Sequence, residues 1–273
     1  MTPVIKSVEL PRQVMLSYVE QGDASGIPVL LLHGVTDSWH SYETVLAYLP
    51  QSIHAFALTQ RGHGDASRPA AGYRFYDFAS DLAAFMDALQ IESAVIVGHS
   101  MGSSVAQRFA IDFPERTFGL VLIGSFATLR GNPAVRELWD STISTLTDPV
   151  DPGFVREFQQ STLAQPVPQA FFEVVVDESL KVPARVWRAA FEGFLEDDFS
   201  GELDKIKSPT LIVWGDQDAF CPLSDQERLT KEIRGAQLVV YASCGHALHW
   251  ERPDRFASDL LAFIETLSGK QRV

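Results

Sequence analysis

Short runs of hydrophobic residues recur along the chain, and segments with a helical repeat separate them. Five runs of four residues end near glycine or polar residues, and a sixth is similar; together they cover residues 29–32, 55–58, 94–97, 120–123, 211–214 and 238–241. Continuous hydrophobic runs of this length are typical of strands that are buried on both faces of a parallel sheet. The pattern therefore predicts six buried strands.

Amphipathic segments lie between these runs. Hydrophobic residues recur with a period near 3.6 in residues 76–89, 100–113 and 252–267, which predicts helices with one buried face. Pro253 suits the first turn of the last helix, where the missing N–H costs no hydrogen bond. We expect residues 4–10 and 15–20 to form an antiparallel hairpin that enters the sheet. Alternating strands and helices predict an α/β fold with helices on both faces of the sheet.

One long segment interrupts the alternation. Residues 129–204 contain no buried strand pattern but several prolines and a set of aromatic residues: Trp139, Phe154, Phe158, Phe171, Phe172, Trp187, Phe191 and Phe194. We expect a helical insertion whose aromatic residues form its own core and also line a hydrophobic pocket over the carboxyl edge of the sheet. Residues 1–128 and 205–273 would then form the α/β core, and residues 129–204 a helical cap.

The strongest local motif is Gly98-His99-Ser100-Met101-Gly102, which lies between a predicted buried strand and a predicted helix. A sharp strand-to-helix turn holds such a serine in a strained conformation, and the flanking glycines leave room where a Cβ would clash. The turn also places the serine at a helix N-terminus, where free amides favour developing negative charge. The motif therefore indicates a nucleophilic serine.

A serine nucleophile needs a base, and the base needs an acid that orients it. His246 follows the predicted strand 238–241, and both Asp216 and Asp218 follow the predicted strand 211–214. Both loops are at strand carboxyl ends, the edge where open α/β sheets assemble their sites. The order serine, aspartate, histidine is the one that the strand-turn-helix motif predicts.

At this point the chain resembles the α/β-hydrolase-fold enzymes, in particular bacterial members with a cap, which include esterases, lactonases and carbon–carbon bond hydrolases. The resemblance spans nearly the whole chain. It rests on several motifs in family order: His33-Gly34, Arg61-Gly62-His63-Gly64, the motif at residues 98–102, Gly215-x-x-Asp218, and Gly245-His246 followed by Glu251-Arg252-Pro253. The resemblance implies a mostly parallel, eight-stranded sheet with helices on both faces and a helical cap.

The resemblance also implies a role for each matching residue. Ser100 corresponds to the family nucleophile, Asp218 to the acid and His246 to the base. The backbone amides of Val35 and Met101 correspond to the oxyanion hole. Asp216 competes with Asp218 for the role of acid, and the Gly-x-x-Asp spacing of the family favours Asp218.

The other histidines and the two cysteines give weaker signals of function. His249 lies three residues after His246, but a His-x-x-His pair without further ligands is a weak metal signal, so we expect neither a metal nor a cofactor. His33 and His99 are expected to pack beside the oxyanion turn and the nucleophile. The two cysteines, Cys221 and Cys244, are too few for a disulfide framework or a four-cysteine zinc site.

The nucleophile narrows the reaction. Dehalogenases and epoxide hydrolases of this fold attack with a carboxylate, so Ser100 favours hydrolysis of a carboxylic ester, including a lactone, with a small to medium apolar acyl group. The pocket residues that bind this substrate cannot be assigned from the sequence. Carbon–carbon bond hydrolysis, perhydrolase activity and a receptor-like binding role are the alternatives, and fold analogy alone does not choose among them.

Composition excludes several other classes. The chain has 273 residues, a formal net charge of −13 and only 22 Lys and Arg, so binding to nucleic acid or to anionic membranes is not expected. No hydrophobic run approaches the ~20 residues that span a bilayer, and residues 1–12 lack a signal-peptide core. These features predict a cytoplasmic protein that acts on a small molecule, and they leave the oligomeric state open.

Overall fold

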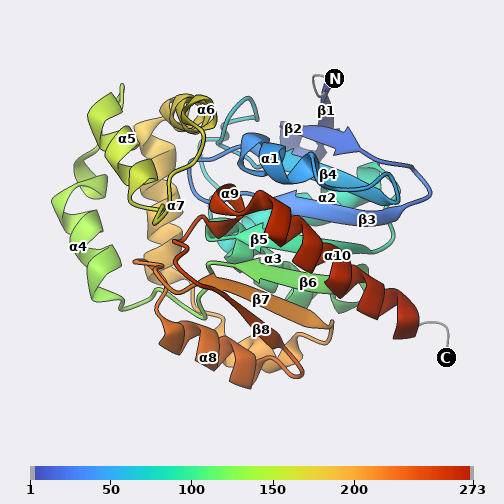
Figure 1. Cartoon of the computed structure of the whole chain (residues 1–273). Coiled ribbons are helices and arrows are strands. Elements are labelled where there is room, and N and C mark those ends of the chain that lie inside the picture. Colours follow the sequence, from blue (N-terminus) through green and yellow to red (C-terminus); the bar gives the residue numbers. More distant parts are fainter. Residues whose placement is uncertain (1–3, 271–273) are drawn as a thin grey trace.

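A computed structural model describes residues 4–270, which form an eight-stranded sheet with helices around it (Figure 1). The strands are β1 (Ile5–Leu10), β2 (Val14–Gln21), β3 (Ile27–Leu32), β4 (Ile53–Thr59), β5 (Ala94–His99), β6 (Thr117–Ile123), β7 (Thr210–Gly215) and β8 (Gln237–Tyr241). Each of the six predicted runs lies inside one of the strands β3 to β8. The predicted hairpin is β1 and β2, which pair antiparallel.

The sheet has the order β1-β2-β4-β3-β5-β6-β7-β8. β2 is antiparallel to both of its neighbours, and all pairs from β4 to β8 are parallel. The predicted fold, an α/β fold with a mostly parallel, eight-stranded sheet, is therefore confirmed. Because the strands from β3 onward run the same way, their carboxyl ends meet at one edge.

Helices cover both faces of the sheet because alternate strand residues point to opposite sides. Leu30 of β3 points into a core cluster that includes residues of α2 (Phe75–Ala88), α3 (Met101–Asp112) and α8 (Leu223–Glu232). Its neighbour Leu31 packs on the other face, which is covered by three helices: α1 (Glu43–Leu46), α9 (Leu248–Glu251) and α10 (Pro253–Lys270). In Figure 1, α9 and α10 cross in front of the strands. As predicted, Pro253 is the first residue of α10.

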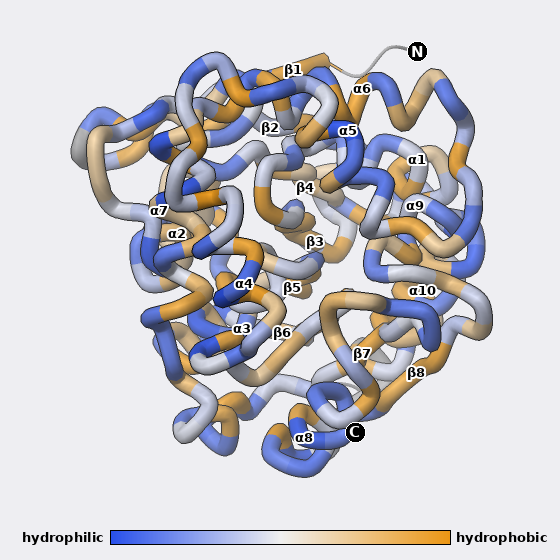
Figure 2. The backbone as a smooth tube through the Cα atoms, turned by 90° about the vertical axis from the view of Figure 1, so that its left-hand side faces the viewer, coloured by the Kyte–Doolittle hydropathy of each residue, from blue (hydrophilic) through white to orange (hydrophobic). Residues whose placement is uncertain are grey.

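The segment between β6 and β7 is helical and adds no strand to the sheet. It contains α4 (Pro133–Ser141), α5 (Pro152–Gln160), α6 (Gln169–Leu180) and α7 (Ala184–Glu196). α4 and α5 each begin with a proline after a capping residue, Asn132 or Asp151, whose side chain accepts backbone N–H groups. These helices gather at one end of the sheet, and Figure 2 looks onto that end, with the mainly hydrophobic strands behind them.

Short 3₁₀ helices connect several elements, at Pro11–Gln13, Trp39–Tyr42, Pro114–Arg116, Ile143–Thr145 and Ser200–Lys205. Across residues 4–270, none of the helices is both long enough and apolar enough to cross a membrane.

Candidate active site

Ser100 occupies the sharp turn between β5 and α3. Its backbone has φ 52° and ψ −115°, an uncommon conformation for a residue with a side chain. The turn is held by the Ser100 amide, which donates a hydrogen bond of 3.0 Å to the carbonyl of Ile123 in β6. The serine is thus fixed at the carboxyl edge of the sheet and directly before a helix N-terminus.

The glycines on either side of this turn are required by close backbone contacts. A Cβ on Gly98 would lie 2.1 Å from the carbonyl oxygen of Gly102. A Cβ on Gly102 would lie 2.3 Å from the carbonyl oxygen of Leu32 in β3. The helix can therefore approach the strands only because both positions lack a side chain, which is the local reason for the glycine spacing around Ser100.

The structure brings His246 and Asp218 together. Nδ1 of His246 donates a hydrogen bond of 2.8 Å to Oδ2 of Asp218, whose side chain is fully buried. The other carboxylate oxygen of Asp218 accepts the backbone amides of Phe220 (2.8 Å) and Cys221 (2.9 Å). These bonds fix the carboxylate, and they leave Nε2 of His246 as the ring nitrogen that can act as a base.

Asp216, the competing acid, lies elsewhere. It is exposed, and its Oδ1 accepts the backbone amide of Ser243 at 2.7 Å, so it caps the loop after β8. Between the two aspartates, the structure places Asp218 beside the histidine.

The two expected oxyanion amides lie at the same edge. Val35 follows Gly34 in the turn after β3, and both line one pocket together with Ser100 and His246. Met101 is the first residue of α3, so its amide has no acceptor within the helix. Amides at a turn and at a helix start are suited to hold a negatively charged oxygen.

A buried polar cluster, which the sequence analysis did not identify, joins the turn after β3 to the helical insertion. Nε2 of Gln159 in α5 donates to Oγ1 of Thr36 (3.1 Å), Oδ1 of Asp37 (3.1 Å) and Oγ of Ser179 in α6 (2.7 Å). All four residues are buried. Burial raises the pKa of Asp37 to about 7. No local sequence motif indicates this cluster, because its members are far apart in the chain.

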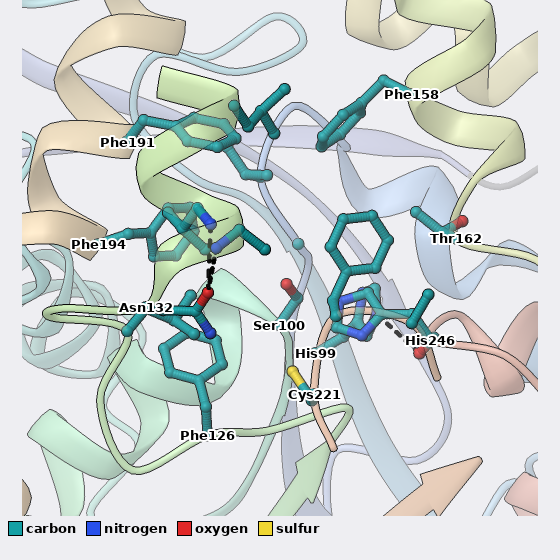
Figure 3. A pocket seen from close by; sticks show the side chains of 18 of the residues that line it. His99, Ser100, Phe126, Asn132, Phe158, Thr162, Phe191, Phe194, Cys221 and His246 are labelled. Carbon is teal, nitrogen blue, oxygen red and sulfur yellow. Dashed lines mark hydrogen bonds between the residues drawn. The ribbon is translucent and has the colours of Figure 1, made fainter. Parts of the chain in front are cut away.

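The neighbouring histidines are buried and neutral. Burial lowers the pKa of His33 and of His99 well below the usual value, and it lowers that of His249 to about 3. His33 packs as expected: its Nε2 accepts the backbone amide of Gln60 at 2.9 Å. Nε2 of His99 lies 3.2 Å from the carbonyl oxygen of His246 (Figure 3). These rings support the turns around Ser100.

A mostly apolar pocket opens beside Ser100 (Figure 3). The cavity volume is about 170 Å³, which is enough for a small organic molecule. The insertion and the loop before it supply Phe126, Leu129, Val135, Leu138, Phe158, Phe191 and Phe194, and the turn after β7 supplies Phe220. Phe158, Phe191 and Phe194 belong to the aromatic set singled out from the sequence.

One group of described residues has the side-chain types and spacing of metal ligands, namely Asp218, Cys221 and His246, with candidate ligand atoms within 4.8 Å of one another. Two donors on one tetrahedral zinc ion are about 3.3 Å apart, given Zn–N and Zn–O distances near 2.0 Å. The 2.8 Å between His246 and Asp218 instead fits a shared proton. His249, the weaker metal candidate of the sequence, is not part of this group.

Comparison with known proteins identifies the family. The model of the alpha/beta hydrolase fold family matches residues 27–253, and the chain belongs to this family. The 2-hydroxymuconate semialdehyde hydrolase of a Pseudomonas species is 29% identical over 266 residues, which cover 92% of this chain and 93% of that protein. A monoacylglycerol lipase from Xenopus laevis is 25% identical over 275 residues, or 92% and 80% of the two chains.

Solved structures agree with this assignment. An esterase from a Rhodococcus species superposes with a TM-score of 0.85 at 26% identity, and the alignment covers 96% of this chain and 99% of the esterase. The protein is thus an enzyme of the hydrolase class, and the resemblance noted in the sequence is confirmed at the level of the family.

Proposed function

We propose that the protein hydrolyses a carboxylic ester, including a lactone, through an acyl-enzyme on Ser100. The observation that carries the proposal is the convergence of a strained serine at a helix start and a buried His246–Asp218 pair on one apolar pocket. In this mechanism, Nε2 of His246 takes the proton of the Ser100 hydroxyl as the oxygen attacks the acyl carbon. Asp218 holds the imidazole in the required tautomer and stabilises the imidazolium.

The backbone amides of Val35 and Met101 would bind the oxyanion of the tetrahedral intermediate. His246 then returns its proton to the leaving alcohol, and the acyl group stays on Ser100. A water molecule, deprotonated by the same histidine, attacks the acyl-enzyme and releases the acid. These reaction steps need water and the chain's own residues.

The pocket supports a neutral, apolar acyl group. Among the described residues that line it, none is Lys or Arg, and five are phenylalanines. A substrate with a carboxylate would therefore have to leave water without a cationic partner, which is costly. This argues against carbon–carbon bond hydrolysis of an anionic dienoate, which is the main alternative reaction. We further propose that residues 129–204 act as the cap that supplies the pocket wall.

The test is hydrolysis of p-nitrophenyl esters from acetate to decanoate by the wild type and by Ser100→Ala. We expect turnover by the wild type, with an optimum at short to medium chains, and its loss in the variant. We expect Ser100→Ala to fold, because the Ser100 side chain makes no capping hydrogen bond that alanine would lose, and circular dichroism checks this. Equal turnover by both proteins would refute the role of Ser100. Labelling of Ser100 by a fluorophosphonate probe without turnover of any ester would favour carbon–carbon bond hydrolysis or a receptor-like role.

A further inference from the structure

Two buried hydrogen-bond acceptors face each other at the wall of the pocket. Oδ2 of Asp37 lies 4.0 Å from Nδ1 of His99, and both residues line the pocket beside Ser100. Because Nε2 of the neutral His99 faces a backbone carbonyl, Nε2 carries the hydrogen and Nδ1 is a free lone pair. Nδ1 has no hydrogen-bond partner among the residues that the structure describes.

The carboxyl group of Asp37 is only partly satisfied. Its Oδ1 is held by Gln159, and its Oδ2 has a long contact of 3.4 Å with Oγ of Ser41; the backbone of Gly34 also stabilises the carboxylate. Since its pKa is raised to about 7 by burial, this carboxyl group is protonated in part of the molecules at neutral pH and can then donate a hydrogen bond. Leaving a buried polar atom without a good partner is costly, so the pair is suited to a polar group that enters the pocket.

Gly34 locates the pair relative to the reaction. A Cβ on Gly34 would lie 2.9 Å from Nδ1 of His99 and 3.1 Å from Oδ2 of Asp37. The next residue is Val35, whose amide is the proposed oxyanion donor, and consecutive Cα atoms are about 3.8 Å apart. The two acceptors therefore lie beside Gly34, the residue directly before the proposed oxyanion donor.

We propose that Asp37 and His99 form a polar subsite for a hydroxyl group on carbon 2 or carbon 3 of the acyl chain. This inference rests on the proposed ester hydrolysis and narrows its substrate to hydroxyacyl esters. The substrate hydroxyl donates to Nδ1 of His99 and accepts from the protonated carboxyl of Asp37. The rest of the acyl chain lies against the phenylalanines, so the pocket recognises an apolar chain with one hydroxyl near the carbonyl.

The test compares esters that differ by the hydroxyl alone. For the wild type, we expect kcat/KM for the better enantiomer of p-nitrophenyl 3-hydroxybutyrate or 2-hydroxybutyrate to exceed that for p-nitrophenyl butyrate at least about tenfold. Asp37→Asn keeps an oxygen for Gln159 and an N–H donor in place of the protonated oxygen, so it should retain the preference. Asp37→Leu, of similar size but apolar, should lose it. Asp216→Asn changes an exposed carboxyl that does not line the pocket, so it is the control and should keep the wild-type ratio.

Binding separates this proposal from the proposed reaction. In Ser100→Ala, ligand-observed NMR should show tighter binding of methyl 3-hydroxybutyrate or methyl 2-hydroxybutyrate than of methyl butyrate, and Asp37→Leu added to this variant should remove the difference. If Asp37→Leu does not fold, as judged by circular dichroism, Asp37→Ala replaces it. If binding depends on the hydroxyl but no ester is turned over, the subsite proposal is supported and the proposed ester hydrolysis is refuted. Equal binding of hydroxylated and plain ligands overturns the subsite and leaves a role in holding water or packing.

Discussion

Replacing Asp218 by Asn tests the acid and base at atomic detail. One oxygen of Asp218 accepts two backbone amides, those of Phe220 and Cys221, while the other faces Nδ1 of His246 at 2.8 Å. In Asp218→Asn, the two backbone donors require the amide oxygen on their side. The NH₂ group must then face His246, where a donor would meet the N–H of Nδ1.

The imidazole resolves this conflict by changing its tautomer. Nδ1 of His246 becomes the acceptor and the hydrogen moves to Nε2, which can then no longer take the proton of Ser100. The equivalent change in the catalytic triad of a serine protease lowers kcat by about 10⁴. At about 1.4 kcal/mol for each factor of ten, the transition state loses about 5 kcal/mol of stabilisation. Because the side chain keeps its size and most of its hydrogen bonds, we expect little change in the fold.

The assay is kcat for p-nitrophenyl butyrate, with the melting temperature measured for each protein. Asp216→Asn is the matched control, because Asp216 is exposed and its side chain bonds to Gln217 and to the backbone amide of Ser243, not to His246. Its kcat should stay within about twofold of the wild type. A large loss in Asp216→Asn together with nearly normal activity in Asp218→Asn would refute the assignment of the acid.

Three further predictions concern stability. Gly102→Ala should lower the free energy of unfolding by about 3 kcal/mol or more, because its Cβ would lie 2.3 Å from a carbonyl oxygen of β3. In the control, Gly201→Ala, no atom lies within 4 Å of the new Cβ, so the free energy of unfolding should change by less than about 1 kcal/mol. Equal values for the two variants in urea unfolding would contradict the close contact. Gln159→Leu removes the amide shared by three buried oxygens and should cost about 2–3 kcal/mol; an unchanged urea midpoint would show that these bonds do not hold the insertion. Burial lowers the pKa of His63 to about 4 and of His249 to about 3, so the unfolded chain binds protons below pH 6.5 that the folded protein does not. Asp37 opposes this trend, because its pKa of about 7 lets the folded protein bind one proton that the unfolded chain does not. His33 and His99, whose pKa values are also lowered, act in the same direction as His63 and His249, so the histidines outweigh the one carboxyl group. The free energy of unfolding should therefore fall between pH 6.5 and pH 4, and a constant value in that range would contradict the burial of neutral histidines.

The sequence by itself determined the sheet and the position of Ser100, the proposed nucleophile. Hydrophobic runs that are buried on both faces and amphipathic segments between them are local patterns, so β3 to β8 and the main helices could be predicted. The turn at Ser100 was also predictable, because the close contacts of Gly98 and Gly102 leave a local signature. His246 and Asp218 could be proposed because both follow strands that end at one edge.

The tertiary structure decided what surrounds these residues. Only packing in three dimensions places Asp218, and not Asp216, beside His246. Gln159 reaches Asp37 across 122 positions of the chain, and no repeat or motif encodes such a contact. The pocket and its polar wall result from side chains that converge from distant segments. Hydrogen bonds and burial in the pocket depend on the whole packed fold, whereas strands and turns depend on neighbours in the chain.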